Sequence, residues 1–238
     1  MNSVKNSTFL FLLFLVSSTL QSQTLKTTNQ HAWISYAGNH PIKNKLSLQL
    51  ELSIRRNDYL KNPQQLLFRT GLVKEVGKGL SIAGGYCYAM TYPYGVFASK
   101  SNFPEHRIWE QIQLRKKVKK LELVSRVRLE QRFVYQPILV NASYESGPAV
   151  YSTRLRMMER LSYPIFAATI QEHVFYATGF DEIFYGFGTQ IGIHHLDQNR
   201  AFIGVGYVVR TFGRIELGYL HQFQGLLILY LTFFLFLF

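Results

Sequence analysis

The chain has 238 residues, of which 47% are hydrophobic and 15% aromatic, and its formal net charge is +12. This length suits a single domain of the barrel or sandwich class, and the single cysteine, Cys87, excludes an intramolecular disulfide. A basic chain invites a nucleic-acid partner. The arginines alternate with apolar residues and form no basic tract, so we expect no nucleic acid.

The first 22 residues have the organisation of a secretory signal peptide. Lys5 gives a weakly positive start, Phe9–Val16 is a short apolar core, and Ser17–Gln23 is a small, polar cleavage region. The apolar core is too short to span a bilayer, which takes about 20 residues. We therefore expect residues 1–22 to be a cleaved signal peptide and residues 23–238 to form the mature domain. An uncleaved N-terminal anchor is the alternative.

The segment Leu121–Phe133 shows the pattern that dominates the rest of the chain. Its even positions from 126 to 132 are Arg, Arg, Glu and Arg, and its odd positions are mostly Leu, Val and Phe. Successive side chains of a strand point to opposite faces, so one face is charged and the other apolar. This pattern is typical of a strand that has lipid on one side and a polar lumen on the other.

Ten such segments predict an all-β fold, an antiparallel transmembrane β-barrel. Most have about the 9–11 residues that a tilted transmembrane strand needs, whereas most strands of soluble proteins have about 5–6. A soluble periplasmic β-sandwich that binds a ligand shares the alternation and is the alternative. The expected strands are Leu46–Arg55, Gln65–Val76, Leu80–Tyr92, Glu105–Lys116, Lys120–Val134, Tyr151–Tyr163, Val174–Tyr185, Arg200–Val209, Ile215–Phe223 and Leu226–Phe238.

The connections alternate between short turns and longer loops, as expected for periplasmic turns and outer loops. Counted from Leu46, ten strands leave both ends of the barrel in the periplasm. Two segments conflict with this count: Ser162–His173 is long where a short turn is expected, and His31–Tyr36 resembles an eleventh strand. A missed crossing within Ile165–Ile170 would give twelve strands, which is the alternative.

The C-terminal segment Leu226–Phe238 is strand-length, apolar and ends in an aromatic residue. A terminal aromatic resembles the signal read by the barrel-assembly machinery of the outer membrane, so we expect this machinery to be a partner through Phe238. A transmembrane helix is less suited, because the segment is short and lacks flanking Lys or Arg. We therefore expect location in the cell outer membrane, with membrane lipid and lipopolysaccharide phosphates as partners of the basic chain.

Several short motifs follow one another along the middle of the chain: Gly85-Tyr86, Glu105–Gln111, Arg126–Arg132, Asp181–Phe184, Asn199-Arg200, Gly204–Tyr207 and Glu216–Leu220. Their order and spacing resemble the outer-membrane family called domain of unknown function 2490, over roughly Trp33 to Phe223. The resemblance implies an outer-membrane β-barrel of unassigned activity from Gram-negative, Bacteroidetes-type bacteria, with no catalytic residues to transfer. The chain departs from the family after Phe223, where relatives usually have a final strand with polar alternates.

Charged residues on neighbouring expected strands should share the lumen and pair, because unpaired charges in a narrow lumen are costly to desolvate. We interpret them as structural filling, with a selectivity lining for anionic solutes as the alternative. A conduit would be narrow, since open channels are typical of barrels with about 16 or more strands. The predicted network comprises Arg107, Glu110, Arg126, Arg128, Glu130, Arg132, Arg154, Arg156 and Arg160.

No motif specifies catalysis, a metal or a cofactor, and we expect none of the three. The adjacent pair His194-His195 would point to opposite faces of a strand, although both could approach Asp197 in a loop. The alternative of a lipid-modifying hydrolase or acyltransferase requires a serine and a histidine near the rim. The candidates for that pair are Ser143, Ser146, Ser152, His106 and His173. The preferred interpretation is a non-enzymatic envelope barrel, structural or a narrow conduit.

Overall fold

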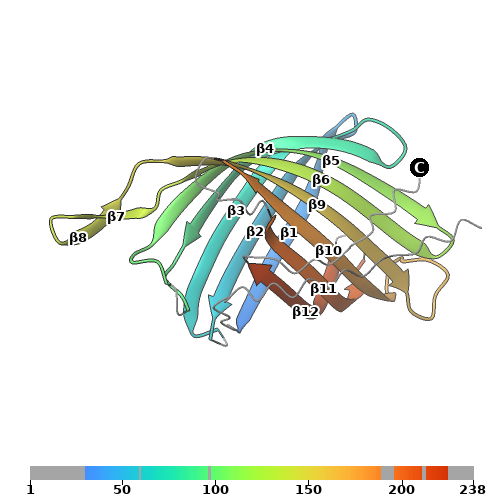
Figure 1. Ribbon diagram of the computed structural model, residues 1–238. Coiled ribbons are helices and arrows are strands. Elements are labelled where there is room, and N and C mark those ends of the chain that lie inside the picture. Colours follow the sequence, from blue (N-terminus) through green and yellow to red (C-terminus); the bar gives the residue numbers. More distant parts are fainter. Residues whose placement is uncertain (1–29, 59, 96–97, 189–195, 211–212, 225–238) are drawn as a thin grey trace, which may run out of the picture.

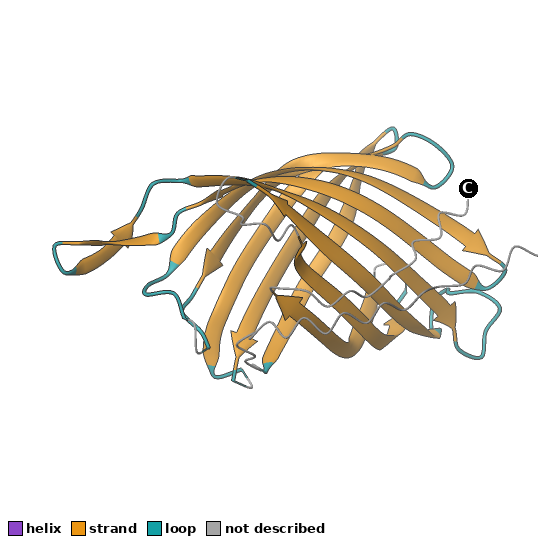
Figure 2. Ribbon diagram, in the orientation of Figure 1, coloured by secondary structure: helices purple, strands orange, loops and turns teal. Residues whose placement is uncertain are grey.

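The computed structural model describes residues 30–58, 60–95, 98–188, 196–210 and 213–224. Ten antiparallel strands form one strongly curled sheet, in the order β1-β2-β3-β4-β5-β6-β9-β10-β11-β12 (Figure 1). The remaining strands, β7 and β8, form a hairpin that projects from one end of the sheet. No helix occurs in these residues (Figure 2). The predicted all-β antiparallel architecture with ten strands is confirmed.

The ten strands of the sheet have between 11 and 16 residues each. They are β1 (His31–Lys43), β2 (Leu46–Asn57), β3 (Asn62–Glu75), β4 (Leu80–Thr91), β5 (Phe103–Val118), β6 (Leu121–Val134), β9 (Val150–Pro164), β10 (Phe175–Phe187), β11 (Leu196–Val208) and β12 (Arg214–Gln224). The hairpin comprises β7 (Pro137–Val140) and β8 (Ser143–Ser146). Nine of the ten strands in the sheet correspond to expected ones.

The tenth strand differs from the expectation. β1 is hydrogen-bonded to β2 along its whole length, so the segment from His31 is part of the sheet. The segment Ile165–Ile170 contains no strand and belongs to the loop of residues 165–174, which excludes the crossing invoked for twelve strands. The expected final strand, Leu226–Phe238, lies outside the described residues, as does the predicted signal peptide.

Inclusion of β1 also changes where the sheet begins. His31 pairs with Asn57, next to the β2–β3 turn, and Gln224 pairs with Gln198, next to the β10–β11 connection. The described sheet therefore begins and ends at the edge that carries the longer loops, which we call the long-loop edge. The expectation that the sheet starts at the opposite, short-turn edge was wrong, because it began the count one strand too late. The expectation that the chain returns to the short-turn edge in Leu226–Phe238 stays a prediction, since that segment lies outside the described residues.

Tight turns at the short-turn edge follow from the sequence. Asn44 and Lys45 connect β1 to β2 with φ values of 50° and 62°. Two successive left-handed residues make a type I′ turn, whose twist matches that of the flanking strands, and asparagine adopts this conformation readily. At the long-loop edge, Asn141 and Ala142 form the same kind of turn within the β7–β8 hairpin, with φ values of 45° and 64°.

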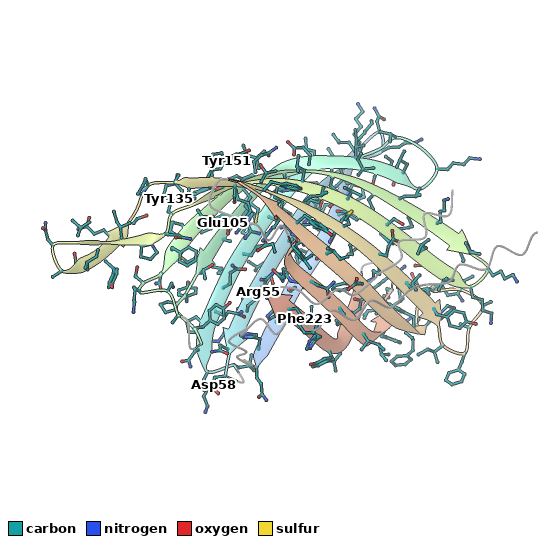
Figure 3. All side chains as sticks on the ribbon, in the orientation of Figure 1. Arg55, Asp58, Glu105, Tyr135, Tyr151 and Phe223 are labelled. Carbon is teal, nitrogen blue, oxygen red and sulfur yellow. The ribbon has the colours of Figure 1, made fainter. Side chains whose placement is uncertain are left out.

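The two faces of the sheet differ in chemistry because residue alternation separates them. The concave face carries buried polar and charged side chains such as Arg69, Arg128 and Glu130. The convex face carries exposed apolar side chains, among them Ile203 and Leu217, which are 70% and 83% exposed. Side chains extend from both faces in Figure 3. No helix in the described residues is long and apolar enough to cross a membrane.

A large aromatic residue fills the middle of the concave face. Trp109 is fully buried against Leu67, Cys87 and Ala89. Its ring lies over Gly71 of β3, where an added Cβ would be only 2.5 Å from Trp109 Cζ2. The glycine thus provides the space that the indole occupies.

Candidate functional site

The carboxylate of Glu130 is the centre of the concave face. The residue is completely buried and lies within reach of four arginines from three other strands. The shortest separations are 2.8 Å, from its oxygens to Arg154 Nη2 and Arg156 Nη1. Arg69 Nη2 donates at 3.2 Å, and Arg107 Nη1 lies 3.9 Å away. One negative charge is therefore surrounded by four positive ones.

Three further glutamates neutralise this excess from the periphery. Arg107 donates to both oxygens of Glu105 at 2.8 Å, a bidentate geometry that strengthens a charge-assisted bond. Glu182 accepts from Arg156 and, at 2.7 Å, from Arg126. The remaining contacts of this kind join Arg132 to Glu105 and Arg69 to Glu51.

Strand register explains why these residues meet. Glu130 of β6 stands directly opposite Arg154 of β9, and Arg132 stands opposite Arg107 of β5. Opposite residues of adjacent strands have Cβ atoms about 4.5–5.5 Å apart, so their long side chains meet without distortion of the sheet. Alternate residues of adjacent strands thus form one continuous charged surface on the concave face.

Arg128 differs from its neighbours because it has no carboxylate partner among the described residues. Its guanidinium donates twice to Gln111 Oε1, at 2.9 and 2.6 Å, and lies 4.9 Å from the centre of the Trp109 ring. An aromatic face attracts a cation, more strongly when water is excluded. Arg128, which is 1% exposed, is held by an amide and an aromatic ring.

A cavity of about 660 Å³ lies above this network, toward the long-loop edge. Its size is within the range of about 300–1,000 Å³ that is usual for ligand sites. Seven arginines, three acidic residues and five glutamines contribute to its wall. The lining residues are Glu51, Arg55, Gln64, Gln65, Leu67, Arg69, Thr91, Tyr94, Phe103, Glu105, Arg107, Arg132, Gln136, Arg154, Arg156, Leu196, Asp197, Gln198, Arg200 and Gln222.

The structure places most of the predicted lumen residues together. The concave face joins seven of the nine in or beside the Glu130 network: Arg107, Arg126, Arg128, Glu130, Arg132, Arg154 and Arg156. Arg160 is also on this face but pairs with Glu216, nearer the short-turn edge.

Glu110 does not join this network. It is exposed, and its carboxylate accepts from Gln131 Nε2 at 3.4 and 3.3 Å on the convex face. The reason is parity: Arg107 points inward, so position 110, three residues later, points outward.

Several members of the network were missed by the sequence analysis. Glu51 and Arg55 occupy alternate positions of β2, and the same parity rule would have placed both on the concave face. The partners across the lumen had no local signal, because they come from strands far apart in the chain. These missed residues are Glu51, Arg55, Arg69, Glu182 and Arg200.

The candidate catalytic pairs do not assemble in the described residues. His106 Nδ1 is hydrogen-bonded to the Tyr86 hydroxyl at 2.5 Å, and His173 Nδ1 to the Tyr207 hydroxyl at 3.0 Å. Ser143 donates to the Val140 carbonyl within the β7–β8 hairpin. No serine is hydrogen-bonded to a histidine in this part of the chain. His194 and His195 lie outside it, and Asp197 pairs with Arg154 at 3.3 Å.

The fold and the site together define a curled antiparallel sheet with an ion-paired inner face. The family profile described as "Protein of unknown function (DUF2490)" matches residues 30–226. The chain belongs to this family, as the ordered motifs predicted. No curated protein and no solved structure matches the chain.

Proposed function

We propose that the protein is an outer-membrane β-barrel of the cell envelope, with lipid against its convex face and an ion-paired interior. One observation carries the proposal: each of the ten strands exposes a large apolar side chain on the convex face, while the charges are buried inside. In water this arrangement is unfavourable, whereas in a bilayer it matches both environments. The exposed residues, one from each strand in turn, include Ile34, Ile54, Phe68, Ile82, Ile108, Leu129, Leu161, Phe175, Ile203 and Leu217.

Aromatic contacts at the two ends of the convex face also support lipid against that face. The ring centroids of Phe133 and Tyr151 are 5.3 Å apart near the long-loop edge, and those of Phe175 and Tyr207 are 4.6 Å apart near the short-turn edge. Transmembrane barrels carry aromatic girdles at both interfaces, where amphipathic rings contact headgroups. The long-loop edge would face outward, toward lipopolysaccharide.

The interior supports a structural role over that of a permanently open pore. Trp109, Arg128 and Glu130 are at most 1% exposed and fill the middle of the concave face. An aqueous path would have to displace the indole or break charge-assisted bonds. A continuous conduit would therefore require rearrangement of this layer.

Heat-modifiable migration tests the membrane barrel directly. Protein extracted from membranes in mild detergent should migrate differently on a gel before and after boiling, because a folded barrel resists the detergent. Recovery in the aqueous fraction, together with identical migration of both samples, would contradict the proposal and favour a soluble sandwich.

Planar-bilayer recording then distinguishes a filled interior from a conduit. The reconstituted wild-type protein should show no stable single-channel steps. Regular steps, abolished when the protein is omitted, would overturn the structural role and favour the conduit.

A further inference from the structure

We propose that the cavity at the long-loop edge is a binding site for a water-soluble, phosphorylated sugar. The proposal goes beyond the membrane barrel, because it concerns the charges and amides of the concave face and does not depend on what covers the convex face. Its centre is a pair of arginines, Arg55 and Arg200, on either side of the lumen.

Among the arginines of the cavity wall, these two are the ones without a carboxylate partner in the described residues. Seven arginines line the cavity. Five of them, Arg69, Arg107, Arg132, Arg154 and Arg156, form ion pairs with glutamate or aspartate. Within the described residues, Arg55 and Arg200 form none.

Instead, both guanidinium groups lie against one aromatic side chain. The Arg55 guanidinium carbon is 4.1 Å from the centre of the Trp33 ring, and that of Arg200 is 5.0 Å away. Arg200 Nε donates to Gln222 Oε1 at 3.1 Å. Two like charges that share one neutral neighbour repel each other, and an anion bound between them would remove that cost.

Unsatisfied polar atoms lie beside these charges. Arg55 Nε, Arg69 Nε, Trp33 Nε1 and Gln64 Oε1 are buried and lack a hydrogen-bond partner in the described chain. Three of the atoms are donors and one is an acceptor, so they match a ligand that carries both anionic oxygens and hydroxyl groups. Arg55, Arg69 and Gln64 line the cavity, and Trp33 lies against Arg55. Buried polar groups normally have partners, so three such atoms in the cavity wall and one beside it favour a ligand at this place.

The register keeps these groups in place. Trp33 stands directly opposite Arg55, and the register of β2 with β3 shifts between Arg55 and Arg56. Bulges of this kind redirect side chains and are frequent at barrel rims and beside sites. Arg56, the next residue, points away and donates to the carbonyls of Leu60 and Lys61 at 2.9 and 2.7 Å. Arg55 thus lines the cavity, whereas the adjacent Arg56 binds the backbone of the β2–β3 turn.

The remaining wall indicates a sugar in preference to a bare anion. The cavity of about 660 Å³ is far larger than one phosphate, and its wall carries five glutamines: Gln64, Gln65, Gln136, Gln198 and Gln222. An amide side chain both donates and accepts, as hydroxyl groups do. The polar wall lies inside the curl of the sheet, so a soluble sugar phosphate fits better than a lipid-borne one, whose acyl chains would have to cross charged side chains.

Calorimetry on the detergent-folded protein tests the proposal with glucose 6-phosphate as the probe. We expect saturable binding that is tighter than that of glucose or inorganic phosphate alone. Arg55→Gln and Arg200→Gln should each weaken it by about tenfold or more, the usual effect of losing a charge-assisted bond. Arg56→Gln, the matched control, should leave it unchanged.

A second measurement needs no variant. Phenylglyoxal modifies accessible arginines, and mass spectrometry identifies the modified positions. Glucose 6-phosphate should protect Arg55 and Arg200 but not Arg56. Absence of binding, equal binding of inorganic phosphate, or protection that excludes Arg55 and Arg200 would overturn the proposal. So would binding only of a phosphorylated glycolipid presented in micelles. None of these results affects heat-modifiable migration, so the two proposals fail independently.

Discussion

The same ten strands form the concave and the convex face of the sheet, with alternate residues pointing to each. The concave face is charged and the convex face is apolar. On β6, Glu130 is completely buried among arginines, while its neighbour Leu129 is 37% exposed on the other side. In a soluble protein the charged face would be outside and the apolar face would form the core. This difference between the faces is the reason for proposing lipid against the convex face, with charge pairing stabilising the concave one.

Loss of the central carboxylate should have the largest effect on this arrangement. In Glu130→Gln, four buried arginines lose their shared counter-charge, and breaking a buried ion pair costs about 3–5 kcal/mol. We expect the free energy of unfolding in detergent, measured by urea titration, to fall by that amount. Glu145→Gln on the exposed β7–β8 hairpin, outside the sheet, is the control and should change it by less than about 0.5 kcal/mol. Equal effects would mean that the network does not stabilise the fold.

A charge placed on the apolar face should be the next most costly change. Ile203 is 70% exposed at the middle of β11, and an arginine there should cost about 2–4 kcal/mol near the middle of a bilayer. Leu139→Arg is the matched control, because Leu139 is 64% exposed on the β7 hairpin, outside the sheet. Folding into vesicles, followed by urea titration, should separate the two variants. Similar stabilities would indicate that water covers the convex face.

Packing within the concave face should matter less than its charges. A Cβ at position 71 would lie 2.5 Å from both Trp109 Cζ2 and the Gly84 carbonyl oxygen. Overpacking of this kind costs about 1–3 kcal/mol, so Gly71→Ala should lower the urea midpoint. Gly213→Ala has no atom within 4 Å of the added Cβ and serves as the control. An unchanged midpoint for Gly71→Ala would show that the Trp109 layer is loose.

The smallest effect is expected for the ion pair of Arg160 and Glu216, whose side chains are each 25% exposed. Pairs with access to water contribute about 0–1 kcal/mol and are screened by salt. Arg160→Gln should therefore lower the free energy of unfolding slightly at low salt and hardly at all in 1 M salt, the latter because the Debye length is then about 3 Å. Glu216 keeps a hydrogen bond from the Tyr176 hydroxyl at 2.6 Å. A large, salt-independent loss would place this pair in a dry interior.

Alternation along the strands made much of this predictable from the sequence. The Arg126–Arg132 pattern assigned β6 its two faces correctly, because a period of two has only one geometric interpretation once the strand is recognised. The same rule places Glu110 on the convex face, because it is an odd number of residues from Arg107, and the predicted network is wrong at this position. The segment from His31 has the pattern of a strand and forms β1. The expected preference for an even number of strands gives no reason to leave it out of the sheet.

The candidate site could be predicted only in part. Neighbouring partners such as Glu130 and Arg154 follow from consecutive strands, but contacts across the lumen depend on how strongly the sheet curls. Trp33 and Arg200 are near opposite ends of the chain, and nothing local indicates that they meet. The sequence also does not indicate that Arg55 and Arg200 are the cavity arginines without a carboxylate partner, since ion pairing depends on the assembled network.

The central claim is that the convex face contacts lipid, and spin-label accessibility along β11 tests it most directly. In a Cys87→Ser background, single cysteines would replace Ala201, Phe202, Ile203 and Val205 and would be labelled in protein reconstituted into vesicles. We expect the odd positions, Ile203 above all, to be accessible to oxygen and shielded from a water-soluble nickel complex, and position 202 on the concave face to be shielded from both. High nickel accessibility at the odd positions would contradict it.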